Sequence, residues 1–420
     1  MNKKQIHLGL AAPLILLGIS CTACAGKDPV NPDPGTKPTP TTMRTDGRII
    51  EDVPYVDNSK KSYWCETYSN GTLPAGKDGN GTYTAEVADP SVVRGDDGMF
   101  YMFGTNRVAL KSEDAVNWQL YNTNIVTVGN WASDWAKEKY GDGNGLGIWA
   151  PDVIKVQDQW IYYYSVSGWG RPVGIGYAVS DNPAGPFIDG GRLFIGEDVG
   201  IQNCIDPSIF IEDGKVYMTV GSFQGEYLVE LTDDGMALEG GETYEEQIAY
   251  AKKNKVLIAG KPSGWDGAQY EGTYLTKKGD SYYLFASSGT CCDGTNSTYT
   301  VWVGKADEIT GPYVGSDGKP MTLSGNNNTY GNLVVYAGVG EGLNAYGTGH
   351  NSILIDDAGD WWIYYHAYIK ADNFKTRHFL IDKLEWDEDD YPFVGENQDG
   401  KKKRPSYDYE LDGPRWFDEE

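Results

Sequence analysis

The chain has 420 residues and a formal net charge of −25 at pH 7, from 35 Lys and Arg against 60 Asp and Glu. This acidic balance argues against nucleic acid as a partner, because phosphate binding requires clustered Lys and Arg. The charge suits the solubility of an extracellular protein. Gly and aromatic residues are abundant, with 54 Gly, 30 Tyr and 13 Trp, which is typical of short antiparallel strands joined by tight turns.

Residues 1–24 have the pattern of an export signal. Lys3 and Lys4 precede an apolar run, Leu8–Ile19, that is too short to span a membrane. Cys21 and Cys24 follow this run, and a Cys in this place resembles the acylated residue of bacterial lipoproteins. We therefore predict an exported protein that a lipid anchors to the outer membrane or cell surface. The alternative is a plain secreted or periplasmic protein.

Residues 25–46 are rich in Pro, Thr and Asp and contain almost no apolar residues. Such a segment cannot bury enough surface to fold, so we predict an extended tether between the anchor and the folded part. The remaining residues, 47–420, are long enough for two domains, but repeats run through most of them, which favours one domain.

A β-hairpin pattern recurs five times in this part of the chain. In Ile205–Ser222 an acid opens a hydrophobic strand, a turn follows at 212–215, and a second strand runs to Gly221. In four copies the first aromatic residue after the turn comes eleven residues after the opening residue. The opening residues of these copies are Asp89, Asp206, Glu271 and His350. The remaining copy begins near Pro151, with Asp152 beside it.

Repeats 55 to 79 residues apart, each with a hairpin and room for two more strands, fit the blades of a β-propeller. We therefore predict an all-β fold, a five-bladed β-propeller with a central active-site cavity. A position shared by all blades lies at one distance from the axis, so the opening residues should converge in that cavity. One short helix is expected at Ser133–Lys139, with Ser133 as its N-cap.

Four cysteines remain beyond the signal: Cys65, Cys204, Cys291 and Cys292. Their spacing matches no zinc-binding pattern. Export permits disulfides, although their pairing cannot be read from the sequence. Because a bond between neighbouring cysteines is strained and rare, we expect Cys291 and Cys292 to be reduced thiols.

The opening acids resemble glycoside hydrolase family 43 over about residues 85–392. Enzymes of this family are five-bladed propellers with a general base Asp in an early DPS motif, a second Asp in a later DPS motif and a general acid Glu in an EGT-like motif. The matching residues here are Asp89 (ADPSVV), Asp206 (IDPSIF) and Glu271 (YEGTYL). The stretches GIWAPDV (147–153), NCIDPSIF (203–210), the CC-containing 287–313 and GTGHNSIL (347–354) are similar to the arabinanases of the family.

The resemblance implies an inverting hydrolase that cuts α-1,5-linked L-arabinan internally. Asp89 would activate water, Glu271 would protonate the leaving oxygen, and Asp206 would orient Glu271 and raise its pKa by its charge. His350 would hold one Ca²⁺ ion, mostly through water. Asn203, in the stretch that is similar to the arabinanases' NAIDPS, is expected to contact substrate. The alternative is a purely structural role, in which the Asp residues cap turns, but two DPS motifs and a Glu in one register favour catalysis.

Other polar and aromatic residues have weaker patterns. Trp149 and Trp169 are candidate sugar platforms, because a flat aromatic face covers the apolar side of a furanose ring; the alternative is a place in the core. Asp152 is expected to hydrogen-bond local backbone. His366 and His378 lack a motif and are expected to be structural.

Two further functions stay open. One is an exo-acting α-L-arabinofuranosidase or β-xylosidase on the same fold, because the loops that close a groove into a pocket cannot be read from sequence. The other is a non-catalytic surface lipoprotein that binds glycans, although binding alone does not require a general acid. The expected partner is plant cell-wall arabinan or its oligosaccharides, and the protein is expected to be a monomer.

Overall fold

The structure is a computed structural model that describes residues 42–43, 49–50, 87–122, 124–262, 270–324, 328–336, 345–370, 373–394 and 413–416. The predicted signal and Cys65 lie outside these residues. Of the predicted tether only Thr42–Met43 is described, as strand β1, which pairs with β2 (Ile49–Ile50). None of the helices in the described ranges is long and apolar enough to cross a bilayer.

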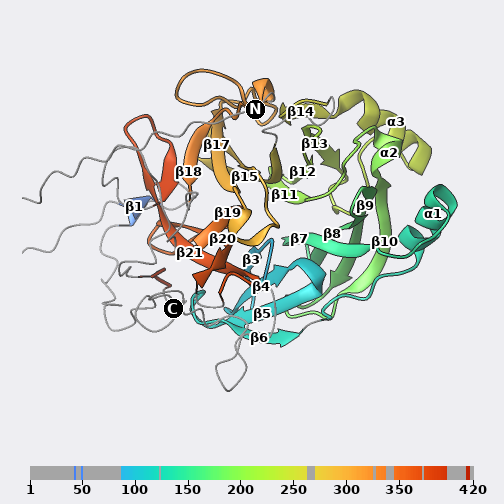
Figure 1. The fold of residues 1–420 in the computed structure, drawn as a ribbon, viewed down its shortest axis with the longest axis horizontal. Coiled ribbons are helices and arrows are strands. Elements are labelled where there is room, and N and C mark those ends of the chain that lie inside the picture. Colours follow the sequence, from blue (N-terminus) through green and yellow to red (C-terminus); the bar gives the residue numbers. More distant parts are fainter. Residues whose placement is uncertain are drawn as a thin grey trace, which may run out of the picture. The chain divides into compact units, whose positions relative to one another are not determined.

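Five antiparallel sheets, each built from four consecutive strands, confirm the predicted five-bladed β-propeller (Figure 1). The strands of blades 1 and 2 are β3 (Ser91–Arg94), β4 (Phe100–Gly104), β5 (Val108–Ser112), β6 (Gln119–Asn122), β7 (Gly147–Val156), β8 (Gln159–Gly168), β9 (Arg171–Ser180) and β10 (Ile188–Ile195). Those of blades 3 to 5 are β11 (Ser208–Glu212), β12 (Lys215–Gly221), β13 (Glu226–Leu231), β14 (Val256–Ala259), β15 (Tyr270–Lys278), β16 (Ser281–Ser288), β17 (Thr300–Ala306), β18 (Asn332–Val335), β19 (Ala345–Ile355), β20 (Trp361–Ile369), β21 (Arg377–Trp386) and β22 (Pro392–Val394).

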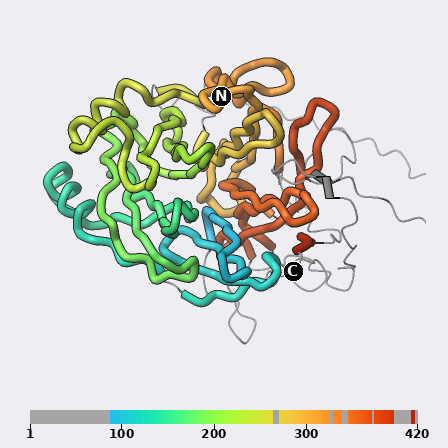
Figure 2. The backbone as a smooth tube through the Cα atoms, turned by 180° about the vertical axis from the view of Figure 1, so that it is seen from behind, coloured from blue at the N-terminus to red at the C-terminus, as the bar shows by residue number. Residues whose placement is uncertain are grey.

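The first strand of each blade lies innermost, so that β3, β7, β11, β15 and β19 surround the centre (Figure 1). From behind, the blades follow one another around this centre in chain order, from blue to red (Figure 2). The ends of the five inner strands are therefore brought together although they are far apart in sequence. This is the placement that the shared register predicts.

The hairpin that defined the repeat forms as expected. Strands β11 and β12 pair with Glu212 opposite Lys215. The two turn residues between them, Asp213 and Gly214, have φ values of 50° and 79°. Two successive positive φ values make the tight turn that joins right-twisted strands, and Asp-Gly is a preferred pair for it.

Aromatic side chains fill the space between blades. Phe103 of β4 meets Tyr162 of β8 edge-on, with ring centroids 5.9 Å apart. Trp118 of blade 1 meets Tyr364 of β20 at 6.1 Å, which packs the first blade against the last. These aromatic contacts between blades, including the one between the last blade and the first, are thus edge-to-face, a geometry that aromatic pairs prefer.

Helices lie between strands and differ from expectation in two ways. Helix α1 (Trp131–Tyr140) starts after the N-cap Asn130, and Ser133 lies inside it with its hydroxyl donating to the Asn130 carbonyl at 2.9 Å, so Ser133 is not the N-cap. Helix α3 (Tyr244–Asn254) was not predicted, although Thr243 and Glu246 form a capping box. The described residues also form shorter helical turns: α2 (Gly196–Val199), η2 (Thr105–Arg107), η3 (Gly294–Asn296) and η4 (Met321–Leu323).

The expectation of reduced thiols at Cys291 and Cys292 is wrong, because these neighbours form a disulfide. They lie in a loop that is closed by a backbone hydrogen bond from Thr298 to Thr290. Cys204 is a buried free thiol.

Candidate active site

One backbone position recurs at the inner strand of every blade and has a left-handed conformation. The five residues are Asp89, Ala150, Asp206, Gly272 and His350, with φ values of 56°, 40°, 59°, 57° and 51°. Non-glycine residues rarely adopt this conformation, and when they do they cluster at functional sites. In blade 4 the glycine takes the shared position and Glu271 lies one residue earlier.

Polar side chains of the preceding blade hold these positions. Four of the bonds are donated by the backbone N–H of the inner strand: Ala150 to Thr105 Oγ1 (2.9 Å), Asp206 to Ser165 Oγ (2.8 Å), His350 to Ser287 Oγ (2.7 Å) and Asp89 to His366 Nδ1 (3.1 Å). In blade 4 the contact is made by a side chain instead, because Ser222 donates to Glu271 Oε2 at 2.9 Å. We call these five contacts the inter-blade ring.

Asp89 lies at the closing point of this ring and is surrounded by donors and cations. Its Oδ1 is 3.2 Å from His366 Nδ1, 3.4 Å from His350 Nδ1 and 3.8 Å from an Arg377 nitrogen. Burial would raise the pKa of Asp89, but these three groups together hold that pKa well below its usual range. Burial lowers the pKa of His350 to about 4, so the cation near Asp89 at neutral pH is Arg377.

Glu271 and Asp206 form a buried pair of the opposite character. Burial is the largest cause that raises the pKa of Glu271, to about 7, and Asp89 adds to the rise. The pKa of Asp206 is also raised, by burial and by Glu271. Two close buried carboxyls do not both ionise easily, so the pair keeps a proton near neutral pH. The prediction that charge on Asp206 sets the pKa of Glu271 is therefore corrected: burial contributes more.

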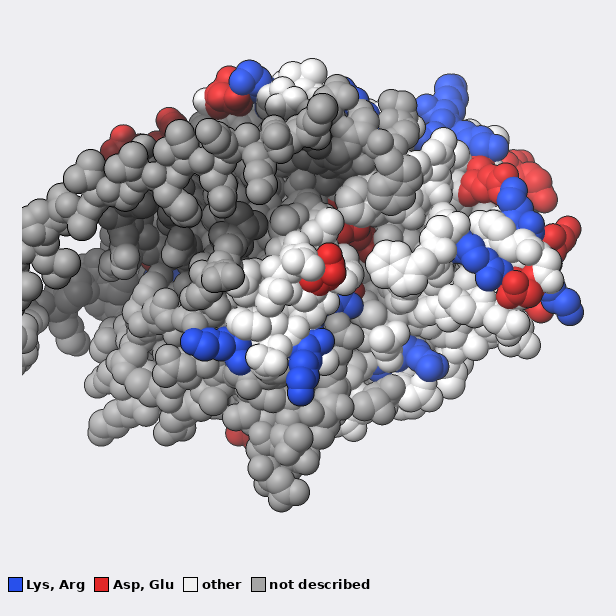
Figure 3. All heavy atoms as spheres, in the orientation of Figure 1, with Lys and Arg blue, Asp and Glu red and all other residues white. Residues whose placement is uncertain are grey.

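Asp206 binds the backbone directly after Glu271. Gly272 N donates to Asp206 Oδ2 at 3.1 Å, which fixes the residue directly after Glu271. A side chain at Gly272 would place its Cβ 2.8 Å from His350 Nδ1. The glycine therefore lets blades 4 and 5 approach each other at the site. In the space-filling view, acidic atoms lie recessed between uncharged surfaces near the centre of the blades (Figure 3).

The structure adds four residues that the sequence patterns did not single out as functional. His366, predicted to be structural, is buried beside Asp89, and Tyr299 stacks on its ring at 5.6 Å. Arg377, at the start of β21, reaches the same carboxylate. Glu226 is fully buried at the start of β13, and its pKa is raised by burial and then by Asp206 and Glu271. Tyr299 belongs to the 287–313 stretch, and the other three follow no local motif, so their place in the site depends on which blades meet.

Two other predicted residues have packing roles. Asp152 accepts from the backbone N–H of its neighbour Val153, as expected, and also from Ser91 Oγ at 2.8 Å and Ile209 N at 2.6 Å, and so joins blades 1, 2 and 3. A turn motif in the sequence cannot reveal that this side chain joins residues of three blades. His378 is buried and its Nε2 lies 2.9 Å from the Thr376 hydroxyl, which agrees with a structural role.

The candidate substrate residues lie toward blade 2. The rings of Trp149 and Trp169 are 5.9 Å apart, and Trp169 is 83% exposed, so it is not part of the core. Asn203 is half-buried, three residues before Asp206. An exposed indole of this kind offers the flat apolar face that sugar rings pack against.

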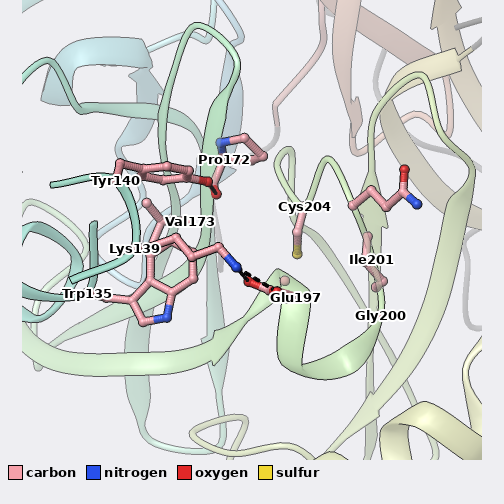
Figure 4. Close-up of a pocket in the computed structure, with 11 residues that line it drawn as sticks. Trp135, Lys139, Tyr140, Pro172, Val173, Glu197, Gly200, Ile201 and Cys204 are labelled. Carbon is pink, nitrogen blue, oxygen red and sulfur yellow. Dashed lines mark hydrogen bonds and ion pairs between the residues drawn. The ribbon is translucent and has the colours of Figure 1, made fainter. Parts of the chain in front are cut away.

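A pocket of about 460 Å³ lies farther along the same blade, between α1, β9 and the segment 196–204. Trp135 and Tyr140 line it with an edge-to-face pair, and the Lys139–Glu197 ion pair spans it at 2.6 Å (Figure 4). Cys204 forms part of its wall, two residues before Asp206. The wall of this pocket is thus directly continuous in sequence with the acidic centre.

The residues around His350 offer few direct ligands for the predicted metal ion. Within the described ranges no group of three or more His, Cys, Asp and Glu side chains is arranged to hold a metal ion. The neutral His350 imidazole and the Asp89 carboxylate are neighbours, which is far from the six to eight oxygens of a Ca²⁺ cage. These residues fit only an ion whose shell water completes.

The family model for "glycosyl hydrolases family 43" matches residues 79–392. The chain belongs to this family. It is 33% identical to the extracellular exo-α-(1→5)-L-arabinofuranosidase of Cellvibrio japonicus, over 76% of this chain and 89% of that protein. It is 30% identical to the extracellular endo-α-(1→5)-L-arabinanase 1 of Bacillus subtilis, over 63% and 83%. Family membership supports a glycoside hydrolase.

Solved structures of the same family are also similar. The arabinanase of Cellvibrio cellulosa complexed with arabinohexaose superposes with a TM-score of 0.60 and 31% identity, over 76% of this chain and 99% of that one. The family 43 endo-arabinanase of Bacillus licheniformis superposes with a TM-score of 0.56 and 26% identity, over 74% and 97%. These comparisons agree with the family and the fold.

The opposite pKa shifts of Asp89 and Glu271 predict the pH dependence of hydrolysis. A carboxyl must be protonated to donate, so activity should fall as pH rises through about 7, the raised pKa of Glu271. Asp89 stays ionised in acid because its pKa is lowered, so activity should persist at pH 5. The measurement is kcat/KM from pH 4 to 9 on soluble arabinan. A rate that rises between pH 7 and 9 would contradict this assignment.

Proposed function

We propose that this family 43 protein is an inverting endo-1,5-α-L-arabinanase. The observation that carries the proposal is a cluster of buried carboxyls whose pKa values are shifted in opposite directions: that of Asp89 is lowered by the imidazoles and guanidinium beside it, and those of Glu271 and Asp206 are raised by burial. Glycoside hydrolysis requires this combination of one base and one acid. A protein that only bound glycans would gain nothing from burying three carboxyls together.

In this proposal Asp89 removes a proton from the water that attacks the anomeric carbon. Arg377 and the two imidazoles favour the ionised form of the carboxylate, and His350 and His366 lie against its Oδ1. Glu271 delivers its proton to the leaving glycosidic oxygen. Ser222 orients the acid by donating to Oε2. Oε1 of Glu271 is buried, and Tyr299 is a second hydrogen-bond partner of this carboxyl.

The substrate class rests on the similar proteins. The Cellvibrio japonicus and Bacillus subtilis relatives are named for α-(1→5)-linked arabinose units, and the Cellvibrio cellulosa structure holds arabinohexaose. Internal cleavage requires binding sites on both sides of the cut bond. The exposed Trp169 and the pocket beside Tyr140, whose ring lies 4.9 Å from the Arg171 guanidinium, are candidate sugar-binding surfaces near blade 2.

A second candidate function is exo-acting hydrolysis, which the name of the Cellvibrio japonicus relative favours. An exo enzyme uses the same carboxyls and differs in the loops around them. The two modes separate cleanly in the products of linear arabinan, because endo cleavage gives a ladder of oligosaccharides and exo cleavage gives one short product from the first minutes.

The proposal is tested with linear 1,5-α-L-arabinan and chromatography of early products, together with proton NMR of the first anomer formed. We expect a ladder of oligomers and a β-anomer, since inversion of an α-linkage gives β. An α-anomer would refute inversion, and a single short product would establish exo action. Absence of any product from arabinan, from β-1,4-xylan and from aryl glycosides would leave a binding protein.

Glu271→Gln should reduce arabinan hydrolysis by at least about a thousandfold while the protein stays folded and binds arabinan. The amide keeps the shape of the side chain but cannot donate the proton, a role that is worth about 10²–10⁴ in rate. Asp89→Asn should be equally inactive because no other base reaches the water. Circular dichroism and arabinan affinity provide the controls. Wild-type turnover in either variant would remove that residue from the catalytic assignment.

We also propose that one Ca²⁺ ion binds near His350, mostly through water. The support is a neutral imidazole next to an ionised carboxylate in the cavity. Exhaustive chelation should lower activity, Ca²⁺ should restore it, and His350→Ala should lose the metal with little change in melting temperature. Elemental analysis counts the ion. Full activity after chelation, with no metal found, would leave His350 as a packing residue.

We also propose export and a lipid anchor. The two curated relatives are named extracellular, which favours an exported protein. Lipid attachment at Cys21 or Cys24, anchoring at the outer membrane or cell surface, and a monomeric state are tested by metabolic lipid labelling, by cell fractionation, and by light scattering of the purified protein.

A further inference from the structure

Thr105 follows the second strand of blade 1 and lies among the buried residues. Its hydroxyl has two partners: it donates to Asp89 Oδ2, and it accepts the N–H of Ala150 at 2.9 Å. We propose that Thr105 is a positioning residue: by joining Asp89 to Ala150 of blade 2, its hydroxyl sets the rotation of the Asp89 carboxylate. The inference deepens the proposed function, since it takes Asp89 as the general base.

The direction of the hydrogen bond is fixed by counting protons. A threonine hydroxyl carries one proton, and a backbone N–H can only donate. Because Oγ1 accepts from Ala150, its own proton is directed to Asp89. A bond from a neutral donor to an ionised carboxylate is among the stronger ones in proteins. Thr105 therefore restrains the ionised form of Asp89, which is the form that a general base needs.

The Thr105 hydroxyl is itself held in place from two blades. Its backbone N–H donates to the Ala88 carbonyl at 3.0 Å, directly before Asp89. Gly104 makes this approach possible, because a Cβ there would lie 2.8 Å from the same carbonyl oxygen. On the other side, Ala150 is buried and held at a φ of 40°. Both neighbours are thus rigid backbone, and the carboxylate orientation follows from them.

With Oδ2 bound to Thr105, Oδ1 is the carboxylate oxygen that faces His350, His366 and Arg377. A rotation of the Asp89 side chain would break both arrangements together. Misplacement of a reacting group by about 1 Å can cost on the order of a hundredfold in rate. The hydroxyl therefore contributes to turnover without touching substrate.

The same blade pair contains a matched control. Ser91 Oγ donates to Asp152 Oδ1 at 2.8 Å and accepts the N–H of Val153 at 3.1 Å. It is a buried hydroxyl between a carboxylate and a blade 2 amide, like Thr105, but its carboxylate is not one of the proposed catalytic groups. Loss of Ser91 should affect stability as loss of Thr105 does, and should leave the chemistry alone.

The experiment compares Thr105→Val, Thr105→Ser and Ser91→Ala with the wild type in the full chain, on arabinan. Thr105→Val, which keeps the shape and removes the hydroxyl, should lower kcat about tenfold or more with KM within about twofold. Thr105→Ser restores the hydroxyl and should recover most of kcat. Ser91→Ala should lower the melting temperature by a similar amount as Thr105→Val and keep kcat within about twofold of wild type.

Three results would overturn the inference: a normal kcat in Thr105→Val, no recovery in Thr105→Ser, or an equal loss of kcat in Ser91→Ala. If the valine variant does not fold, Thr105→Ala is measured against Thr105→Ser with the same expectations. Asp89→Asn in the same assay separates the two levels of the proposal. An active Asp89→Asn contradicts the base assignment itself, whereas an inactive one with normal Thr105→Val contradicts only the role of Thr105.

Discussion

The active centre depends on one interaction that every blade repeats, a hydrogen bond across the blade boundary to an inner-strand residue. Four of these residues are non-glycine and adopt a left-handed backbone, which costs free energy on the order of 1 kcal/mol or more each. That cost is offset because side chains of the preceding blade accept hydrogen bonds from the backbone N–H groups of these residues. The accepting side chains are those of Thr105, Ser165, Ser287 and His366. The backbone turn and the hydrogen bond together aim the side chains at the common axis.

Burial then divides the acids into two groups. Asp89 lies beside Arg377 and two histidines, which lower its pKa, whereas burial and neighbouring carboxyls raise the pKa values of Glu271, Asp206 and Glu226. Groups of the same chemical kind thereby differ in proton affinity, as the proposed base and acid require. The distinction comes from the neighbours that each blade contributes, and no residue in the site sets it alone.

The sequence revealed what is local and repeated. The Asp213-Gly214 turn and the eleven-residue count to the aromatic strand predicted the blades, and the shared opening position predicted which side chains would meet. Contacts between blades were not readable: Asp152 looked like a turn residue, and His366 was one letter in an aromatic strand. Helix α3 was missed although Thr243 and Glu246 carry its start signal, because its turns are largely polar. Cys291 and Cys292 were expected to be reduced because a bond between neighbouring cysteines is strained, and the sequence did not reveal the loop in which they pair.

The bond between Asp89 and His366 joins residues 277 positions apart and is one of the contacts between the last blade and the first. Closing so long a stretch of chain is costly in entropy and slow, so it should come late in folding. The base acquires its imidazole neighbours only at that moment. A nascent or partly folded chain would therefore carry all of its acids and still lack a competent centre, and the appearance of activity would report the docking of the fifth blade.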